Sequence, residues 1–217
     1  RNVTIVDTTA PIITINGNAV ITLAVGATYT DLGASALDNY DGNITPSIFT
    51  INPVDSNTVG VYTIRYSVSD AAGNIATEVS RTVNVVDTTR PVITRIGGAN
   101  ITLEVGASYV DAGAIAEDTV DGDISSKIVV SNPVDVNSLG SYTITYNVQD
   151  NSGNVATQVI RTVHVVDTAK PVISLIGSSA ITIEAGATYI DTGATALDNV
   201  DGDISHSIVV SNPVNVN

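Results

Sequence analysis

The stretch Tyr62-Thr63-Ile64-Arg65-Tyr66-Ser67-Val68 alternates large apolar and polar side chains without interruption. Because successive side chains of a strand point to opposite faces, this pattern is typical of a β-strand with one face in a core and the other in solvent. The same pattern returns 80 residues later as Tyr142-Thr143-Ile144-Thr145-Tyr146-Asn147-Val148. The fold therefore has to be derived from a repeated unit.

The repeat extends over the whole chain of 217 residues. Asp7-Thr8-Thr9-Ala10-Pro11 recurs as Asp87-Thr88-Thr89-Arg90-Pro91 and as Asp167-Thr168-Ala169-Lys170-Pro171, and the stretches between these sequences match without gaps. We expect residues 1–6 to be the end of the closing strand of a preceding repeat, 7–86 and 87–166 to be two complete repeats, and 167–217 to be a third repeat truncated before its last two strands. The absence of Met adds to the expectation that this is a window of a longer repeating chain.

Each repeat reads as a series of short strands. In the first repeat we expect strands at 12–15, 20–25, 29–37 (bending at Gly33), 44–51, 62–69 and 77–86, with Pro46 at an edge or outside the ladder. No window of ten residues shows helical periodicity. The predicted fold class is all-β, with two antiparallel sheets packed face to face and roughly seven strands per repeat.

Composition narrows the possible functions. Apolar residues make up 43% of the chain, but it has one Phe and no Trp, so Val, Ile and Leu must build the cores. The 22 acidic residues against 8 basic ones give a net charge of −14, which disfavours nucleic acid and anionic membranes as partners. The absence of Cys excludes disulfides and thiolate metal sites. No run of 18 apolar residues is present, so we expect no membrane span in this sequence.

One position breaks the alternation of the closing strand. Arg81 falls on the face of Val79, Val83 and Val85, and Arg1 and Arg161 occupy the equivalent positions. Two interpretations stay open. Either the arginine pairs across the sandwich with the aspartate that recurs after a strand tyrosine (Asp31, Asp111, Asp191), or a bulge shifts the face of the strand.

Acidic residues recur in three segments of every repeat: the joint, the mid-unit turn and the turn after the Tyr-rich strand. Because strands alternate in direction, these three segments should meet at the end of the repeat where the chain enters, with a loop such as that of Asp55 added from the preceding repeat. The candidate metal ligands are Asp7, Asp38, Asp41, Asp70 and Asn74, then Asp87, Asp118, Asp121, Asp123, Asp150 and Asn154, and in the third repeat Asp167, Asp198, Asp201 and Asp203.

Such a cluster calls for a counterion. Two carboxylates about 4 Å apart repel by roughly 4 kcal/mol at an effective dielectric constant of 20. Lys and Arg are too scarce to neutralise the clusters, and Ca²⁺ prefers six to eight oxygen ligands of this kind. The alternative is that Asp, Asn and Gly serve only as β-turn residues. An EF-hand is excluded, because aligning Gly42 with the loop glycine puts Leu37 and Ile48 at ligand positions.

Three motifs together resemble the bacterial immunoglobulin-like repeats of long surface proteins. They are Val-Val-Asp-Thr-Thr-x-Pro at the joints, Asp-x-Val-Asp-Gly-Asp mid-unit, and Tyr-Thr-Ile-x-Tyr-x-Val-x-Asp-x-x-Gly-Asn near the end of each complete repeat, and the likeness covers the whole chain. The resemblance implies tandem immunoglobulin-like β-sandwich domains in a linear array. It also implies an extracellular stalk or adhesin array, often with calcium at the joints.

The sequence therefore predicts a non-catalytic extracellular stalk or spacer of a bacterial surface or secreted protein, stiffened by Ca²⁺ between neighbouring repeats of one polypeptide. Two alternatives stay open: adhesive modules that bind a ligand or glycan, and the subunit of an extracellular filament of like chains. An enzyme is disfavoured because no catalytic set recurs, and His164 and His206 belong to no repeated group. Lys127 and Lys170, the only lysines, lie at different repeat positions, which disfavours one Lys–Asn isopeptide bond per repeat.

Overall fold

The structure is a computed structural model that describes residues 1–215. Its regular structure is almost entirely β, and its helices are 3-10 turns of three residues each. Among the described residues, no helix has the length and apolar character needed to cross a bilayer. The chain divides into two compact units, one of Arg1–Val92, Ala116–Lys127 and Val148–Thr157, the other of Ile93–Ile115, Ile128–Asn147 and Gln158–Asn217.

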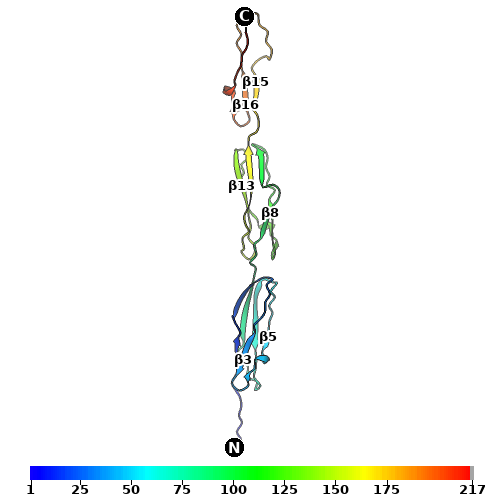
Figure 1. Cartoon of the computed structure of the whole chain (residues 1–217), viewed down its shortest axis with the longest axis vertical. Coiled ribbons are helices and arrows are strands. Elements are labelled where there is room, and N and C mark those ends of the chain that lie inside the picture. The colour runs from blue at the N-terminus through cyan, green and yellow to red at the C-terminus, as the bar shows by residue number, and fades with distance from the viewer. Residues whose placement is uncertain (216–217) are drawn as a thin grey trace. The chain divides into compact units, whose positions relative to one another are not determined.

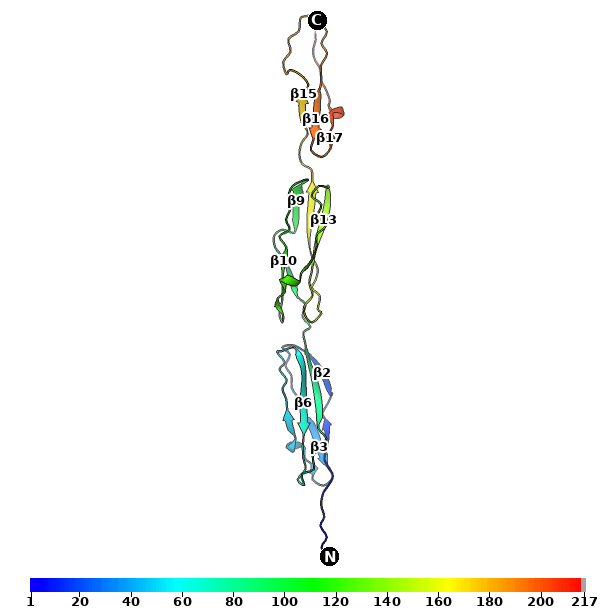
Figure 2. The same cartoon turned by 180° about the vertical axis from the view of Figure 1, so that it is seen from behind.

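The first unit contains the whole first repeat, which is a two-sheet sandwich (Figure 1). One sheet has the order β1-β3-β4 and is antiparallel, with β1 at Ile12–Ile15, β3 at Ala34–Asp38 and β4 at Gly42–Asn43. The other has the order β2-β7-β6-β5, with β2 at Val20–Ala24, β7 at Val79–Val86, β6 at Gly60–Ser67 and β5 at Phe49–Ile51. Figure 2 shows β2 and β6 of this second sheet from behind.

The predicted split of the first strand is confirmed, because β1 and β2 belong to different sheets. β2 pairs in parallel with β7, whereas the β5–β6 and β6–β7 pairs are antiparallel. The first unit also holds β11 (Gly122–Asp123) and the 3-10 helix η2 (Ser125–Lys127) from the second repeat. Both sheets of the first repeat thus close around one core.

The second unit contains most strands of the second repeat. A four-stranded sheet has the order β12-β13-β14-β9, with β12 at Val129–Ser131, β13 at Gly140–Asn147, β14 at Val159–Val166 and β9 at Asn100–Glu104. The counterparts of β1 and β3 are β8 (Val92–Arg95) and β10 (Ala114–Asp118). In the third repeat, β15 (Val172–Leu175), β16 (Ala194–Asp198) and β17 (Gly202–Asp203) form a three-stranded sheet, followed by η3 (Ser205–Ser207). Residues 180–184, the counterpart of β2, are exposed and form no strand.

The strand with the strict alternation of apolar and polar residues, β6, supplies the centre of the core. Ile64 and Tyr66 of β6 are fully buried, and Val83 and Val85 of β7 are at most 1% exposed. The β6–β7 ladder runs without a bulge from Gly60 to Tyr66. The bulge interpretation of the arginine is therefore wrong, since the arginine keeps its place on the inner face.

Arg81 is fully buried and forms an ion pair with Asp31, which confirms the predicted pairing across the sandwich. The Tyr66 hydroxyl donates to both oxygens of Asp31 at 2.8 and 2.7 Å, and Arg81 Nε donates to the Asn18 carbonyl at 3.1 Å. Burial together with the Asp31 carboxylate raises the pKa of the Tyr66 hydroxyl. Arg161 and Asp111 repeat the pair in the second repeat. This network is structural, because it is enclosed in the core.

Two predicted strands are wrong in part. The strand expected at 29–37 begins only at Ala34, because Gly33 takes a φ of 69° that an extended strand does not have. The strand expected at 44–51 is reduced to β5, because Thr45–Ser47 forms the 3-10 helix η1. Thr45 Oγ1 there accepts a hydrogen bond from the Ala36 amide at 3.0 Å, in place of a ladder partner. Pro46 lies in this turn, outside the ladder as predicted.

Candidate metal centre

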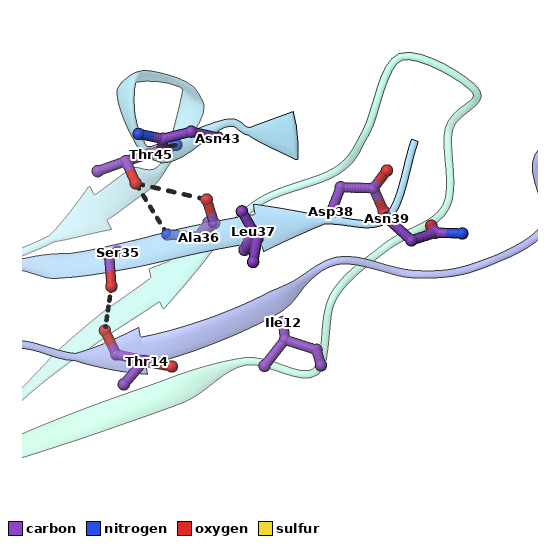
Figure 3. A pocket seen from close by; sticks show the side chains of 9 residues that line it. All are labelled: Ile12, Thr14, Ser35, Ala36, Leu37, Asp38, Asn39, Asn43 and Thr45. Atoms are coloured by element: carbon purple, nitrogen blue, oxygen red, sulfur yellow. Dashed lines mark hydrogen bonds between the residues drawn. The ribbon is translucent and has the colours of Figure 1, made fainter. Parts of the chain in front are cut away.

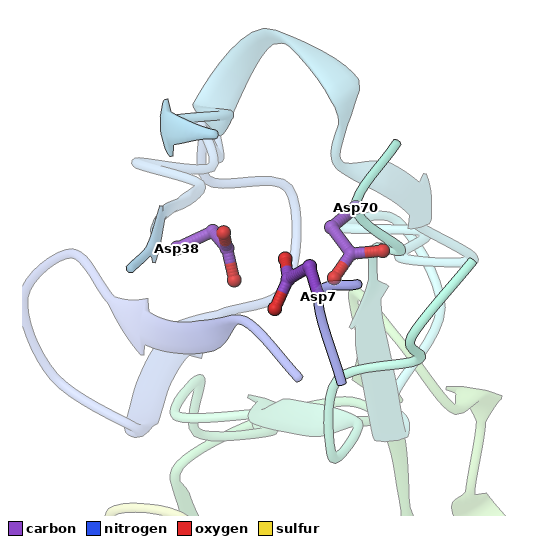
Figure 4. Close-up of side chains that lie close together, drawn as sticks. All are labelled: Asp7, Asp38 and Asp70. Atoms are coloured by element: carbon purple, nitrogen blue, oxygen red, sulfur yellow. The ribbon is translucent and has the colours of Figure 1, made fainter. Parts of the chain in front are cut away.

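Three carboxylates from three separate segments meet at one end of the first repeat (Figure 4). Asp7 lies on the chain that leads to β1, Asp38 ends β3, and Asp70 follows β6. Each contributes one oxygen to a group whose members all lie within 4.8 Å of one another. Asp38 and Asp70 are buried, and Asp7 is half-buried. The predicted convergence of the acidic segments is thus present in the first repeat.

The second repeat builds the same cluster from Asp87, Asp118 and Asp150. Their oxygens satisfy the same 4.8 Å limit, and all three residues are buried, at 6%, 7% and 6% exposure. All three belong to the first compact unit. Since the two clusters sit at equivalent repeat positions, their geometry follows from the repeat and not from one chance contact.

Local turns hold each carboxylate by one side. Asp38 Oδ1 accepts hydrogen bonds from the Tyr40 and Asp41 amides, both at 2.8 Å, and Gly42 closes the turn with a φ of 72°. Asp7 Oδ1 accepts from the Thr9 amide at 3.0 Å. These are the side-chain-to-backbone bonds that Asp makes in turns, so the turn interpretation explains one oxygen of each residue.

Three carboxylate oxygens of the clusters have no such donor. Asp7 Oδ2, Asp38 Oδ2 and Asp87 Oδ2 are buried and have no hydrogen-bond partner. Asp38 and Asp87 are only 4% and 6% exposed. A buried carboxylate oxygen without a partner carries a large desolvation cost. Turn hydrogen bonds alone therefore do not account for these three oxygens.

Hydrogen bonds favour the ionised form of two of the clustered carboxylates, Asp38 and Asp150. The Asp41 and Tyr40 amides lower the pKa of Asp38. Burial acts to raise the pKa of Asp150, but the side-chain and backbone donors of Asn154 outweigh burial and lower it. Within residues 1–215, the ion pairs of Arg65, Arg81 and Arg161 all involve carboxylates outside the two clusters. Among the described residues, neither cluster therefore contains an ion pair with an arginine or lysine.

The predicted asparagines act as donors beside the clusters. Asn74 donates its amide N–H to Asp70 Oδ1 and its Nδ2 to Asp70 Oδ2, both at 2.7 Å. The same Nδ2 lies 3.3 Å from the Asp7 carbonyl. Asn154 repeats these contacts with Asp150 and Asp87. The Asn residues thus orient the third carboxylate.

Four predicted ligands lie outside the two clusters and accept hydrogen bonds from other groups. Asp41 Oδ2 accepts from the Ala71 amide at 2.7 Å, and Asp121 accepts from the amide and Nδ2 of Asn151, both at 2.7 Å. Asp123 and Asp203 accept from the serines that begin η2 and η3. Asp41 and Asp121 therefore tie two acidic loops together, whereas Asp123 and Asp203 fix a neighbouring turn.

The third repeat supplies Asp167, Asp198 and Asp201. Asp198 accepts from the Val200 amide at 2.8 Å and from the Asp201 amide at 3.0 Å, as its counterparts do, and these donors lower its pKa. The pKa of Asp167 is raised, first by burial and then by the charges of Asp198 and Glu104. The carboxylates of Asp167 and Asp198 thus interact electrostatically.

Sequence reasoning missed two residues of these end loops. The Thr89 hydroxyl bridges Asp87 Oδ1 at 2.5 Å and Asp118 Oδ2 at 3.3 Å. Glu104 accepts from the backbone of Thr168, and that amide donor lowers the pKa of Glu104. The threonine could have been found from its recurrence at Thr9 and Thr89. Glu104 recurs at Glu184 but not in the first repeat, which has Ala24, and recurrence alone did not show that its side chain meets the joint.

A separate shallow cavity of about 550 Å³ lies on the outer face of β1 and β3 (Figure 3). Ile12 and Leu37 line it with Thr14, Ser35 and Thr45, and Ser35 Oγ lies 3.5 Å from the Thr14 carbonyl. Asp38 reaches its rim, but no second carboxylate lines it. The lining offers no set of groups for acid–base or nucleophilic chemistry.

The two-sheet sandwich, its recurrence and its end clusters define a class of tandem immunoglobulin-like modules. The chain belongs to the family described as bacterial surface protein, Ig-like domain, which matches residues 13–85, 93–165 and 173–217. Membership confirms the resemblance seen in the sequence and makes the chain a surface or extracellular module.

Relatives share the repeat over most of this chain. The chain is 38% identical to hyalin of Lytechinus variegatus over 193 residues, and 32% identical to an uncharacterized 81.3 kDa protein of Acholeplasma phage L2 over 186 residues. These matches cover 80% and 81% of the chain but only 34% and 24% of the relatives. The chain therefore spans about a third or less of the length of these proteins.

Solved structures share a looser likeness. A lipoprotein from Bacteroides thetaiotaomicron matches with a TM-score of 0.33 and 15% identity, over 69% of this chain and 98% of that one. A structure of the M60 catalytic domain with CBM51 domains from Clostridium perfringens ZmpB also has a TM-score of 0.33 and 15% identity, over 85% of this chain and 33% of that one.

Proposed function

We propose that this chain is a non-catalytic spacer of a surface or secreted protein, and that Ca²⁺ bound by its end clusters fixes successive repeats. The observation that carries this proposal is the set of buried carboxylate oxygens without partners in two equivalent clusters. Hard oxygen ligands drawn from three flexible segments suit Ca²⁺ better than Mg²⁺, which demands near-ideal octahedral geometry.

The order of the chain explains how an ion there would act on a joint. Asp87 directly follows Val86, the last residue of β7 in the first repeat. Asp118 and Asp150 belong to the mid-unit and late turns of the second repeat. An ion held by all three would tie the segment that leaves one repeat to two loops of the next. The backbone of that segment would then have less conformational freedom, because the ion would hold Asp87 to Asp118 and Asp150 in addition to the covalent connection.

The non-catalytic part of the proposal rests on repetition. The acidic clusters and the buried Arg–Asp pairs occur at equivalent positions of two repeats, whereas an enzyme builds one site from unlike parts. The titratable groups buried in the core are already paired, as Arg81 is with Asp31. Among the described residues, the buried carboxylate oxygens that lack a partner all belong to the end clusters, and such oxygens suit a cation better than a reaction.

Calorimetric titration of the full chain with Ca²⁺ and separately with Mg²⁺ tests the proposal. We expect calcium to bind at the two complete clusters and magnesium to bind much more weakly. The Asp118→Asn variant should remove one site, and Asp135→Asn is the matched control. Asp135 caps the Asn137 amide at 3.0 Å in a turn of the same kind outside the cluster. Absence of calcium binding, or equal loss in the control, would overturn the proposed function.

A further inference from the structure

The Glu104 carboxylate accepts hydrogen bonds from the segment that leaves the second repeat. It is the last residue of β9, where it pairs in register with Val166, the last residue of β14. Its Oε1 accepts from the Thr168 amide at 2.8 Å and the Ala169 amide at 3.2 Å, and its Oε2 accepts from the Thr168 hydroxyl at 2.8 Å. One side chain therefore receives three donors from two consecutive joint residues.

These bonds restrain a segment that otherwise has few ladder partners. The joint between β14 and β15 consists of residues 167–171, which carry no regular structure. Hydrogen bonds to a charged acceptor are roughly twice as strong as neutral ones. Because the Glu104 carboxylate binds two consecutive residues, it fixes the orientation of this segment as well as its distance from β9. The carboxylate thus sets how the chain departs from β14.

The first repeat lacks this device. The residue equivalent to Glu104 is Ala24, whose methyl group accepts no hydrogen bond. The joint donors are the same in kind, since Thr88 and Thr89 occupy the places of Thr168 and Ala169. One chain therefore contains two joints of equal length that differ at this acceptor. The third repeat carries Glu184 at the same position.

From this difference we infer that Glu104 is a positioning residue for the joint after the second repeat, where it restricts the motion of the joint without any metal ion. The joint after the first repeat, with Ala24, has the Thr89 and Asn154 hydrogen bonds but no equivalent of Glu104, so its further restraint comes from the cation. Only this second statement rests on the proposed function. Joints along the array would then be of two kinds: one locked by the chain itself and one that responds to calcium.

Distance measurements between spin labels in the full chain test the inference, because the chain has no Cys of its own. Labels at Ser141 and Thr195 report on the Glu104 joint. Labels at Val61 and Ile115, which lie 80 residues earlier, report on the Ala24 joint. All four positions are exposed. Both pairs are measured with a chelator and with saturating Ca²⁺.

In chelator, we expect the Ser141/Thr195 distance distribution to be narrower than the Val61/Ile115 distribution. Glu104→Ala should broaden it to the width of the Val61/Ile115 pair, and Glu104→Gln should broaden it less because one acceptor oxygen remains. Ala24→Glu should narrow the Val61/Ile115 distribution. Hydrogen exchange of β13 and β14 should stay unchanged in Glu104→Ala, which separates positioning from folding.

An unchanged Ser141/Thr195 width in Glu104→Ala would overturn the inference, as would an Ala24→Glu chain that is no narrower across the first joint. Either result would leave the calcium proposal intact, because both are obtained without the ion. Conversely, a Val61/Ile115 distance distribution whose width does not change with calcium would contradict the proposed function while leaving the role of Glu104 in place.

Discussion

The substitution Asp87→Asn should change the stability of the second repeat in opposite directions with and without calcium. Without divalent ions, Asp87 adds a negative charge to those of Asp118 and Asp150 and leaves its own Oδ2 without a partner. Asparagine removes that charge. Its Oδ1 can still accept from the Thr89 amide, now 2.9 Å from Asp87 Oδ1, and its Nδ2 places a donor where the unpartnered oxygen stood.

The size of the effect follows from the cluster geometry. Charges at the 4.8 Å limit of the cluster repel by about 3.5 kcal/mol per pair at an effective dielectric constant of 20. Salt and residual exposure reduce this value, so we expect the variant to gain about 1–3 kcal/mol in chelator. With calcium at 100 times its dissociation constant, the natural chain should gain about 2.7 kcal/mol that the variant largely loses.

Hydrogen exchange read by mass spectrometry is the suitable assay, because it resolves the stability of separate repeats in one chain. Peptides from β13 and β14 report on the second repeat, and peptides from β6 and β7 serve as an internal reference. Asp135→Asn, outside the cluster, should act in the same direction with and without calcium. If Asp87→Asn destabilises the second repeat equally in chelator and in calcium, the cluster is a hydrogen-bonded turn and our electrostatic reasoning fails.

Two further predictions concern the core. Asp111→Asn leaves the 2% exposed Arg161 guanidinium without its carboxylate, so the second repeat should lose about 3–5 kcal/mol by hydrogen exchange; an equal loss in the first repeat would contradict this. Tyr66→Phe removes the hydroxyl that donates to Asp31 and should cost about 1.5–3 kcal/mol. Because the folded state raises the pKa of Tyr66 above its reference of 10.0, its contribution to stability is complete below about pH 10 and falls as the pH rises above that value. Melts across about pH 9 to 11 should show a steeper alkaline loss in the natural chain than in Tyr66→Phe, and identical slopes would refute the assignment.

Much of the fold follows from the period-2 pattern and the 80-residue repeat. The run that contains Ile64 and Tyr66 forms β6 as predicted, because only a strand places those side chains on one face. The boundaries of β3 and β5 could not be predicted. They depend on the positive φ of Gly33 and on the hydrogen bond from the Ala36 amide of β3 to Thr45 Oγ1 of η1.

The cluster was predictable as a location but not atom by atom. Strand direction alone brings the segments of Asp7, Asp38 and Asp70 to one end of a repeat. Which acidic residue of a turn faces its neighbours depends on local hydrogen bonds: Asp38 faces inward, whereas Asp41 accepts from the Ala71 amide. The sequence shows that both residues are acidic and belong to one turn, but it does not show which amides their oxygens meet.

One repeat contains two kinds of acidic site, which differ in how the charge of the carboxylate is balanced. Asp31 enters the sandwich with a guanidinium and hydroxyl donors, so its charge is balanced within the chain. Asp7 and Asp38 lie close together with one buried oxygen each that nothing balances. The fold thus supplies Arg81 to one carboxylate but no cationic side chain to the clustered ones. Under the proposed function a divalent cation would balance several of these carboxylates at once, and its ligands would include Asp7 of the joint.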